Sequence, residues 1–161
     1  MQKVTADNVY SWLREVKDPE IPVLSLVDLG VINEVDVDGN AVRVVITPTF
    51  VGCPALDIMQ TDIRSTLRAK GFTSVEIEVS YKTPWTSDKI SPEGKEALRK
   101  FGLAPPPSRQ LFSDLDVLAH ATCPRCGNNN TELRNVFGTT LCRSIHYCNQ
   151  CKEGFEQFKP I

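Results

Sequence analysis

The chain has 161 residues and a mass of 17.9 kDa, enough for one ordinary domain or two small ones. Its 18 Lys and Arg against 20 Asp and Glu give a net charge of −2, which argues against a dedicated nucleic-acid-binding protein, because such proteins normally carry a basic excess. No apolar run approaches the roughly 20 residues that cross a bilayer, and residues 1–7 hold no apolar core of a signal peptide. We therefore expect a cytoplasmic protein with no membrane partner.

The region before the three consecutive prolines shows the periodicities of alternating helices and strands. Its first half predicts a helix capped by Thr5 that ends before Pro19, and strands over residues 31–37 and 42–47 joined by a turn at Gly39. Its second half predicts a helix that begins at Pro54 and ends at Gly71, a strand over residues 75–81, and a short helix capped by Ser91. The order α-β-β-α-β predicts an α+β fold, a compact layer of helices on a small sheet.

The prolines after Ala104 suggest where this layered domain ends. Three successive prolines cannot continue a helix or enter a central strand, and they stiffen a chain toward an extended form. The composition predicts an α/β domain over residues 1–104, a proline-rich linker over residues 105–118, and a small cysteine-rich domain over residues 119–161.

The tail carries two CxxC pairs, formed by Cys123, Cys126, Cys148 and Cys151. Two residues between cysteines let both thiolates face one point, and four such thiolates satisfy tetrahedral zinc. The pattern predicts a zinc ribbon in which the metal is a structural staple without chemistry of its own. An iron–sulfur centre on the same thiolates is the alternative, and a thioredoxin-type redox pair is disfavoured because two matched pairs indicate one shared site.

Between the two pairs, the sequence predicts a hairpin with strands over residues 133–136 and 139–141 and a turn at Gly138. Cys142 and His146 fall in the same interval and are candidate spare ligands. A cysteine in such a place is more often a small buried hydrophobe, and His146 is expected on the surface or in the hairpin.

Cys53 is the one cysteine outside the tail. Pro54 fits a first helical position, which predicts Cys53 at the N-cap, where free amides and the helix dipole would lower the pKa of its thiol. The residues leave two interpretations equally open, a reactive or metal-binding thiol and a thiol that merely caps and packs. Asp18 and Glu20 lie in a proline-containing loop, where Asp18 could simply serve as a cap or turn residue. The two carboxylates could instead lie beside Cys53, where their negative charge would oppose the helix and raise the pKa of the thiol, although spacing alone does not bring the two loops together.

Four separated motifs occur in one order, Asp18-Pro19-Glu20-Ile21-Pro22, Asp28-Leu29-Gly30-Val31, Thr47-Pro48-Thr49 and Gly52-Cys53-Pro54. Over about residues 5–85 they resemble the iron–sulfur cluster assembly family. Three stretches after the cluster assembly region and one in the ribbon extend the resemblance, Pro84-Trp85-Thr86-Ser87-Asp88, Ile90-Ser91-Pro92-Glu93-Gly94, Gly102-Leu103-Ala104-Pro105-Pro106 and Phe137-Gly138-Thr139-Thr140. With them the whole chain resembles the family of phenylacetyl-CoA epoxidase D subunits.

The resemblance implies a role in ring 1,2-epoxidation during bacterial aerobic phenylacetate degradation. The family's system has a di-iron oxygenase and a reductase that carries flavin and an iron–sulfur cluster, and its D subunit is implied to be an accessory maturation factor. The family's functional cysteine corresponds to Cys53, and its Asp-Pro-Glu loop corresponds to Asp18 and Glu20. Lys152 departs from the pattern, because ribbons commonly carry glycine after a cysteine such as Cys151.

Three functions therefore compete. The leading hypothesis is a non-catalytic maturation subunit that assists iron–sulfur or di-iron centre assembly, with structural zinc and a transient iron–sulfur cluster. Its partners would be the other epoxidase components, especially the iron–sulfur reductase subunit, and a homodimer stays open. The alternatives are a structural docking subunit without metal-transfer chemistry and a thiol redox protein using Cys53.

Overall fold

The structure is a computed structural model that describes residues 3–108, 116 and 118–160. The chain divides into two compact units, Met1–Trp85 and Thr86–Ile161. Within the described residues, no helix has the length and apolar character needed to cross a membrane.

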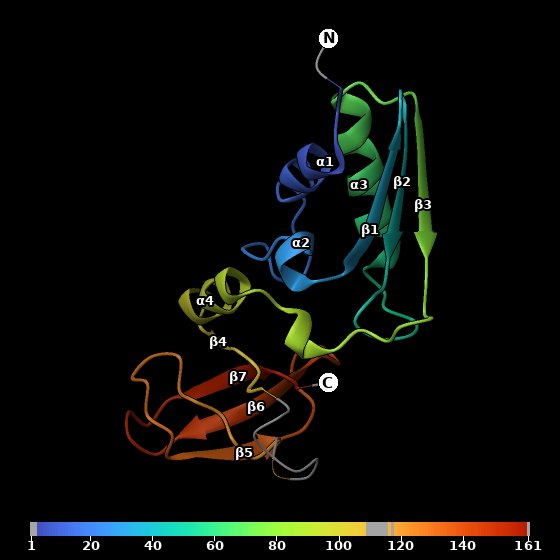
Figure 1. Ribbon diagram of the computed structural model, residues 1–161. Helices are drawn as coiled ribbons and strands as arrows, with labels where there is room; N and C mark the ends of the chain where they lie inside the picture. Colours follow the sequence, from blue (N-terminus) through green and yellow to red (C-terminus); the bar gives the residue numbers. More distant parts are fainter. Residues whose placement is uncertain (1–2, 109–115, 117, 161) are drawn as a thin grey trace. The chain divides into compact units, whose positions relative to one another are not determined.

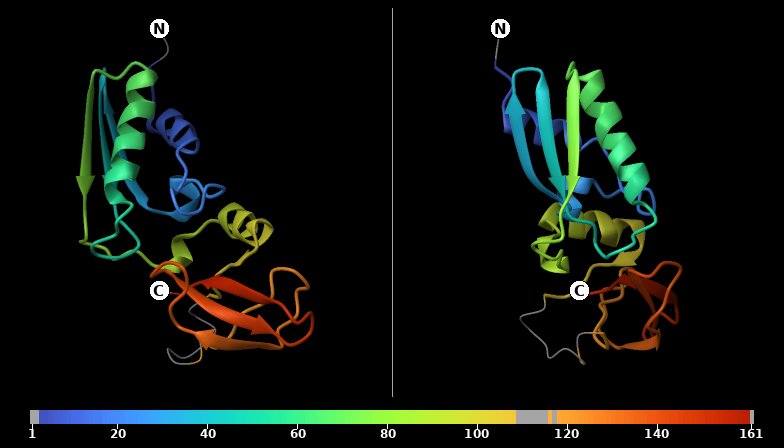
Figure 2. Two further views of the ribbon diagram at one scale, coloured as in Figure 1. Left: turned by 180° about the vertical axis from the view of Figure 1, so that it is seen from behind. Right: turned by 90° about the vertical axis from the view of Figure 1, so that its right-hand side faces the viewer.

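The first unit is a three-stranded sheet with helices on one face (Figures 1 and 2). Its elements are α1 (Ala6–Leu13), α2 (Leu26–Leu29), β1 (Ile32–Asp38), β2 (Ala41–Ile46), α3 (Leu56–Ala69) and β3 (Ser74–Val79). β1 and β2 pair antiparallel, whereas β2 and β3 pair parallel and are joined through α3. A parallel pair needs such a crossover, so β2 and β3 end at the same edge of the sheet. The predicted α+β fold and its order are confirmed, and α2 is a single turn that the sequence did not predict.

Local signals in the sequence set the boundaries of these elements. The Asn8 amide donates to Thr5 Oγ1 over 3.4 Å, which makes Thr5 the N-cap of α1 as predicted. Gly39 has φ +55° in the β1–β2 turn, and Gly71 has φ +102° after α3. Each glycine thus adopts the left-handed backbone that its predicted turn or helix end requires.

The core of the first unit lies between the sheet and its helices. The buried side chains come from the inward faces of α1, α3 and β2, namely Val9, Leu13, Met59, Ile63, Leu67, Val42, Val44 and Ile46. They follow the helical and strand periodicities of the sequence. This packing holds α3 against α1 and β3.

The second unit contains the cysteine-rich tail and the residues that precede it. Its elements are η1 (Ser87–Lys89), α4 (Pro92–Phe101), β4 (Leu103–Ala104), β5 (Thr131–Asn135), β6 (Arg143–Cys148) and β7 (Gly154–Phe158). The sheet order is β4-β7-β6-β5, and β5, β6 and β7 pair antiparallel. The Ser91 hydroxyl accepts from the Gly94 amide over 2.9 Å and caps α4, as the sequence predicts.

The division between the units differs from the predicted boundary at residue 104. β4 pairs with β7, and Ala104 is buried in a cluster with Ala121 and Cys123, so residues 86–104 belong with the ribbon. The first unit instead ends at Trp85, whose indole N–H donates to the Leu29 carbonyl over 2.9 Å. Of the predicted linker over residues 105–118, residues 109–115 and 117 lie outside the described residues.

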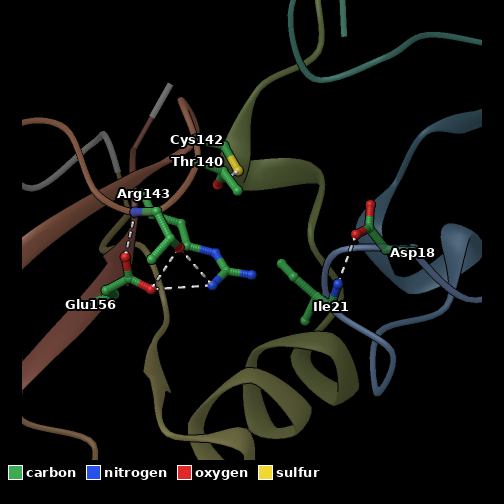
Figure 3. Close-up of polar contacts among 7 residues, drawn as sticks. Asp18, Ile21, Thr140, Cys142, Arg143 and Glu156 are labelled. Carbon is green, nitrogen blue, oxygen red and sulfur yellow. Dashed lines mark hydrogen bonds and ion pairs between the residues drawn. The ribbon is translucent and has the colours of Figure 1, made fainter. Parts of the chain in front are cut away.

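The hairpin of the ribbon also differs from its prediction in one strand. β6 begins at Arg143, and residues 136–142 form the connecting loop, so the predicted strand over residues 139–141 is wrong. The Glu156 carboxylate accepts from the Thr139 amide over 2.7 Å and from Arg143 Nη1 over 3.1 Å, as Figure 3 shows for Arg143. These hydrogen bonds hold residues 136–142 to the Glu156 side chain of β7, and the segment over residues 139–141 is a loop rather than a strand.

Candidate functional site

The first candidate site lies where β2 and β3 end. Thr47 follows β2, is 1% exposed, and donates through its hydroxyl to the Ser80 carbonyl over 2.7 Å. Its amide donates to the Val31 carbonyl over 2.8 Å, and its hydroxyl oxygen accepts from the Asn33 side chain. The loop toward α3 is therefore anchored at the edge where two parallel strands end, a common position for functional loops.

Cys53 lies at the far end of this loop. Gly52 has φ +79°, and the Leu56 amide donates to the Cys53 carbonyl over 3.2 Å, which closes a turn before the helix. α3 begins at Leu56 with Ala55 as N-cap, so the predictions of Cys53 as N-cap and Pro54 as first helical residue are wrong. Cys53 thus lies half-buried in the turn that precedes α3.

Asp18 forms hydrogen bonds that determine the conformation of its own loop. It is 7% exposed, and its Oδ1 accepts from the Glu20 amide over 2.8 Å. The same oxygen accepts from the Ile21 amide over 2.9 Å, the bond drawn in Figure 3. Its own amide donates to the Leu24 carbonyl over 2.8 Å. Asp18 therefore shapes the loop as a turn residue, which was the simpler of its two interpretations.

The loop of Asp18 and Glu20 lies close enough to Cys53 to act on its thiol. Burial raises the pKa of the Cys53 thiol most strongly, and the negative charges of Glu20 and Asp18 raise this pKa further. The amides of Ala55 and Leu56 lower the pKa, but the net shift is upward. Of the two opposing effects expected from the sequence, the lowering by the backbone amides is outweighed by burial and by the two carboxylates.

Exposed apolar side chains flank the half-buried Cys53 along the chain. Val51 is 81% exposed in the preceding loop, and Ile58 is 51% exposed in the first turn of α3. Apolar side chains are therefore left in solvent on both sides of Cys53 along the chain. No motif predicts this surface, since the exposure of a single valine or isoleucine depends on the fold.

The second candidate site is a metal centre in the ribbon. The sulfurs of Cys123, Cys126, Cys148 and Cys151 all lie within 4.8 Å of one another. The Cys123–Cys151 and Cys126–Cys148 sulfur pairs are 3.7 and 3.6 Å apart. Four sulfurs at about 2.3 Å from zinc lie about 3.8 Å apart in a regular tetrahedron. Donor set and spacing therefore fit the predicted zinc.

Each CxxC pair is a tight turn whose amides face the sulfurs. The Gly127 amide donates to the Cys123 carbonyl, and the Lys152 amide donates to the Cys148 carbonyl, each over 2.9 Å. Gly127 has φ +71° and Lys152 has φ +62°, so the turn geometry is kept although lysine replaces the usual glycine. Left-handed backbone costs a non-glycine residue about 1 kcal/mol, a cost that metal binding can offset.

The environment of the sulfurs differs from one cysteine to the next. The amides of Cys151 and Gln150 help to lower the pKa of the Cys148 thiol to about 7. Burial and the neighbouring sulfurs raise the pKa of the Cys151 thiol to about 12. A cation that binds all four sulfurs must therefore displace protons, so metal affinity falls as the pH falls.

The two candidate spare ligands lie outside this centre. Cys142 is buried, and its sulfur lies 3.1 Å from the Thr140 hydroxyl (Figure 3). His146 is in the hairpin, but it is fully buried, stacks on Phe155 and contacts the Ser144 hydroxyl over 2.9 Å through Nε2. The surface position considered for His146 is therefore wrong, because β6 turns this side chain into the core of the ribbon.

Comparisons with known proteins cover both units. Residues 6–79 match the family described as iron–sulfur cluster assembly proteins, and residues 107–159 match the PaaD zinc beta ribbon domain. A protein of Escherichia coli assigned as the D component of 1,2-phenylacetyl-CoA epoxidase is 35% identical over 95% of this chain and 92% of its own length.

Other similar proteins cover the first unit. An Fe–S protein maturation auxiliary factor of Porphyromonas gingivalis is 38% identical over 55% of this chain and 86% of its own length. A crystal structure of a domain of unknown function from Bacillus anthracis superposes with a TM-score of 0.53 and 28% identity, over 57% of this chain and 89% of that chain. The chain belongs to the family of phenylacetyl-CoA epoxidase D subunits, which join an iron–sulfur cluster assembly domain to a zinc ribbon.

Proposed function

We propose that the protein is a non-catalytic maturation subunit of a phenylacetyl-CoA epoxidase, which passes iron–sulfur cargo through Cys53 to a partner subunit. One observation carries the proposal: the half-buried Cys53 lies in the loop between β2 and α3, next to the edge where β2 and β3 end, with the exposed Val51 and Ile58 on either side of it along the chain. The maturation and epoxidase names of the similar proteins point to the same role. The proposal places the protein in the cytoplasm, where thiols stay reduced.

The surroundings of Cys53 suit a site that accepts cargo and then releases it. A protonated thiol must lose its proton to bind iron, and the Glu20 carboxylate near it is a base that can accept this proton. The amides of Ala55 and Leu56 then stabilise the negative charge on the sulfur. In the free protein the raised pKa keeps Cys53 protonated, so the unloaded site resists oxidation and unwanted metal.

The number of thiols in the first unit favours transient binding and transfer of an iron–sulfur cluster over its permanent binding. Cys53 is the sole cysteine before residue 123, and a cluster normally takes four cysteine ligands. Other ligands to the cargo must therefore come from outside this unit. An incoming client cysteine can supply one of them, and the exposed Val51 and Ile58 offer an apolar surface to the client.

The ribbon has a structural role in this proposal. Its four cysteines would hold zinc, which supplies charge neutralisation and cross-linking to a unit with a small buried cluster. No reaction step of the proposal uses the zinc. The client we favour is the reductase subunit that carries an iron–sulfur cluster, with the di-iron oxygenase subunit as the second choice.

Replacement of the thiol tests the proposal in cells that grow on phenylacetate. Cys53→Ser removes the cargo ligand, whereas Cys142→Ser removes a buried thiol that lies outside both candidate sites. We expect Cys53→Ser alone to lower the iron and sulfide content of the purified reductase subunit and to slow growth, with zinc in the ribbon unchanged. A fully loaded reductase with Cys53→Ser would favour the alternative, a docking subunit without metal-transfer chemistry.

A further inference from the structure

The loop between β5 and β6 exposes a group of apolar side chains. Phe137 is 59% exposed, Leu141 is 62% exposed and Val136 is 38% exposed. We call Val136, Phe137 and Leu141 the hairpin patch. Lys159 contacts both the Phe137 ring and the Leu141 carbonyl, and several large apolar side chains exposed on one loop are typical of sites where proteins associate.

The backbone beneath the hairpin patch is held by specific hydrogen bonds. Glu156 accepts from the Thr139 amide and from Arg143, and the Gly138 amide donates to the Arg143 carbonyl over 2.8 Å. A Cβ on Gly138 would lie 2.6 Å from Glu156 Oε1, 3.0 Å from Arg143 Cβ and 3.2 Å from the Arg143 carbonyl carbon, so a side chain here would displace the carboxylate that holds the loop. The patch is thus pre-organised, which lowers the entropy that binding would cost.

A single ammonium group lies at the edge of the hairpin patch. Lys159 Nζ is 4.7 Å from the centroid of the Phe137 ring and donates to the Leu141 carbonyl over 2.8 Å. No carboxylate in the described part of the chain forms an ion pair with Lys159. Burial lowers the pKa of this amine, so a partner carboxylate would meet a partly desolvated charge.

We propose that the hairpin patch and Lys159 form the docking site for another epoxidase subunit, which presents an apolar pocket bordered by at least one carboxylate. The phenylalanine would be the anchor in that pocket, and the ammonium would set its orientation. The choice of an epoxidase subunit as partner rests on the proposed function. The surface itself is independent of Cys53, which belongs to the other unit.

Two other occupants fit the patch less well. A second copy docked on the same patch would bring two Lys159 ammonium groups together, because a twofold contact pairs identical surfaces. A nucleic acid would select a basic stripe, whereas this surface combines three apolar side chains with one cation. The positive charge of Lys159 and the apolar side chains of the hairpin patch together favour a partner protein that carries a carboxylate next to an apolar pocket.

Binding measurements with purified subunits test the proposal. The full-length zinc-loaded protein is immobilised, and the reductase and oxygenase subunits are passed over it one at a time. We expect Phe137→Ala to weaken binding of one subunit about 30-fold and Lys159→Gln to weaken it about fivefold. The matched control is Phe101→Ala, which removes an aromatic side chain of similar exposure, 46%, from α4. It should bind like the unchanged protein.

Salt and a second variant make the outcome decisive. Added salt should weaken binding by the unchanged protein and by Phe137→Ala, but have little effect on Lys159→Gln, because the variant lacks the cation. Cys53→Ser should bind normally even if cluster transfer fails, which separates this inference from the proposed function. Unchanged binding by Phe137→Ala, or the absence of binding between the unchanged protein and every epoxidase subunit, would overturn the proposal.

Discussion

The carboxylate of Glu20 acts on the thiol of Cys53, although Glu20 precedes β1 in the chain and Cys53 follows β2. Its negative charge raises the pKa of that thiol, and Asp18 adds a smaller effect of the same sign. The Glu20 carboxylate therefore lies within electrostatic range of the thiol that is proposed to bind iron. The proposed role of the first unit depends on this relationship.

The pH at which Cys53 becomes reactive should depend on Glu20. Alkylation of Cys53 by iodoacetamide requires the thiolate, so its midpoint should lie above that of an ordinary cysteine. Glu20→Gln removes the carboxylate charge and should lower the midpoint, as read by mass spectrometry of the peptide that contains Cys53. Asp57→Asn is the matched control, because it removes a carboxylate in the first turn of α3 that is not among the main causes of the shift. Equal alkylation midpoints for Glu20→Gln and the unchanged protein would show that Glu20 does not act on the Cys53 thiol.

The raised pKa of Cys53 also predicts the direction in which the stability of the protein changes with pH. The folded-state pKa of Cys53 exceeds its unfolded-state value, so the unfolded chain loses its proton first. The contribution of the buried thiol to the free energy of unfolding is fully present below the pKa of Cys53 in the unfolded chain. It is lost as the pH rises through the pKa of Cys53 in the folded protein. Urea titrations of Cys53→Ser should show a smaller loss of stability on the alkaline side than titrations of the unchanged protein. Parallel curves would contradict the burial of this thiol.

Asp18 should contribute to the stability of the folded protein through the hydrogen bonds in its loop. Asp18→Ala removes the acceptor for the amides of Glu20 and Ile21 in a buried loop, and we expect a loss of about 2 kcal/mol in the free energy of unfolding. Asp18→Asn keeps one oxygen acceptor and should cost less. Urea unfolding followed by circular dichroism measures both. A cost below about 0.5 kcal/mol for Asp18→Ala would contradict the turn role of Asp18.

Removal of metal should affect the two units differently. A chelator should raise hydrogen exchange in β5, β6 and β7, and in β4 as well, because β4 pairs with β7. Residues 3–85 should stay protected, because the first unit has its own core. Mass spectrometry of exchanged peptides reports both regions in one experiment. Equal loss of protection throughout the chain would contradict two separately stabilised units.

Gly138 should tolerate no side chain. Gly138→Ala places a methyl group 2.6 Å from Glu156 Oε1, and we expect a loss of about 1–3 kcal/mol with displacement of the hairpin patch. Gly154→Ala is the matched control, because its nearest neighbour outside the adjacent residues is the His146 carbonyl oxygen at 3.9 Å. Thermal unfolding of the zinc-loaded protein compares the two variants. Equal melting temperatures would show that the loop yields without cost.

Much of the fold can be predicted from the sequence, because its signals are local. Thr5, Gly39 and Gly71 determine caps and turns through their own backbone or side chains, and the structure confirms each. The four ribbon cysteines are likewise predicted from their spacing, since CxxC turns point two sulfurs at one place. The family follows from motifs that keep their order along the chain.

The parts that could not be predicted depend on contacts between distant residues. The pairing of β4 with β7 moves the unit boundary, and nothing in a two-residue strand signals it. The direction of the Cys53 pKa shift required the depth of burial and the position of the Glu20 loop. The start of β6 at Arg143 depends on Glu156, a side chain in the following strand.

The most direct test of the account measures cluster transfer from this protein to the reductase subunit. The protein is loaded anaerobically with iron and sulfide, mixed with metal-free reductase, and the rise of the reductase cluster is followed by circular dichroism and by recovered electron transfer. The account predicts that the unchanged protein and Cys142→Ser accelerate loading, whereas Cys53→Ser performs like free iron and sulfide. Equal acceleration by Cys53→Ser and the unchanged protein would contradict the central role of Cys53.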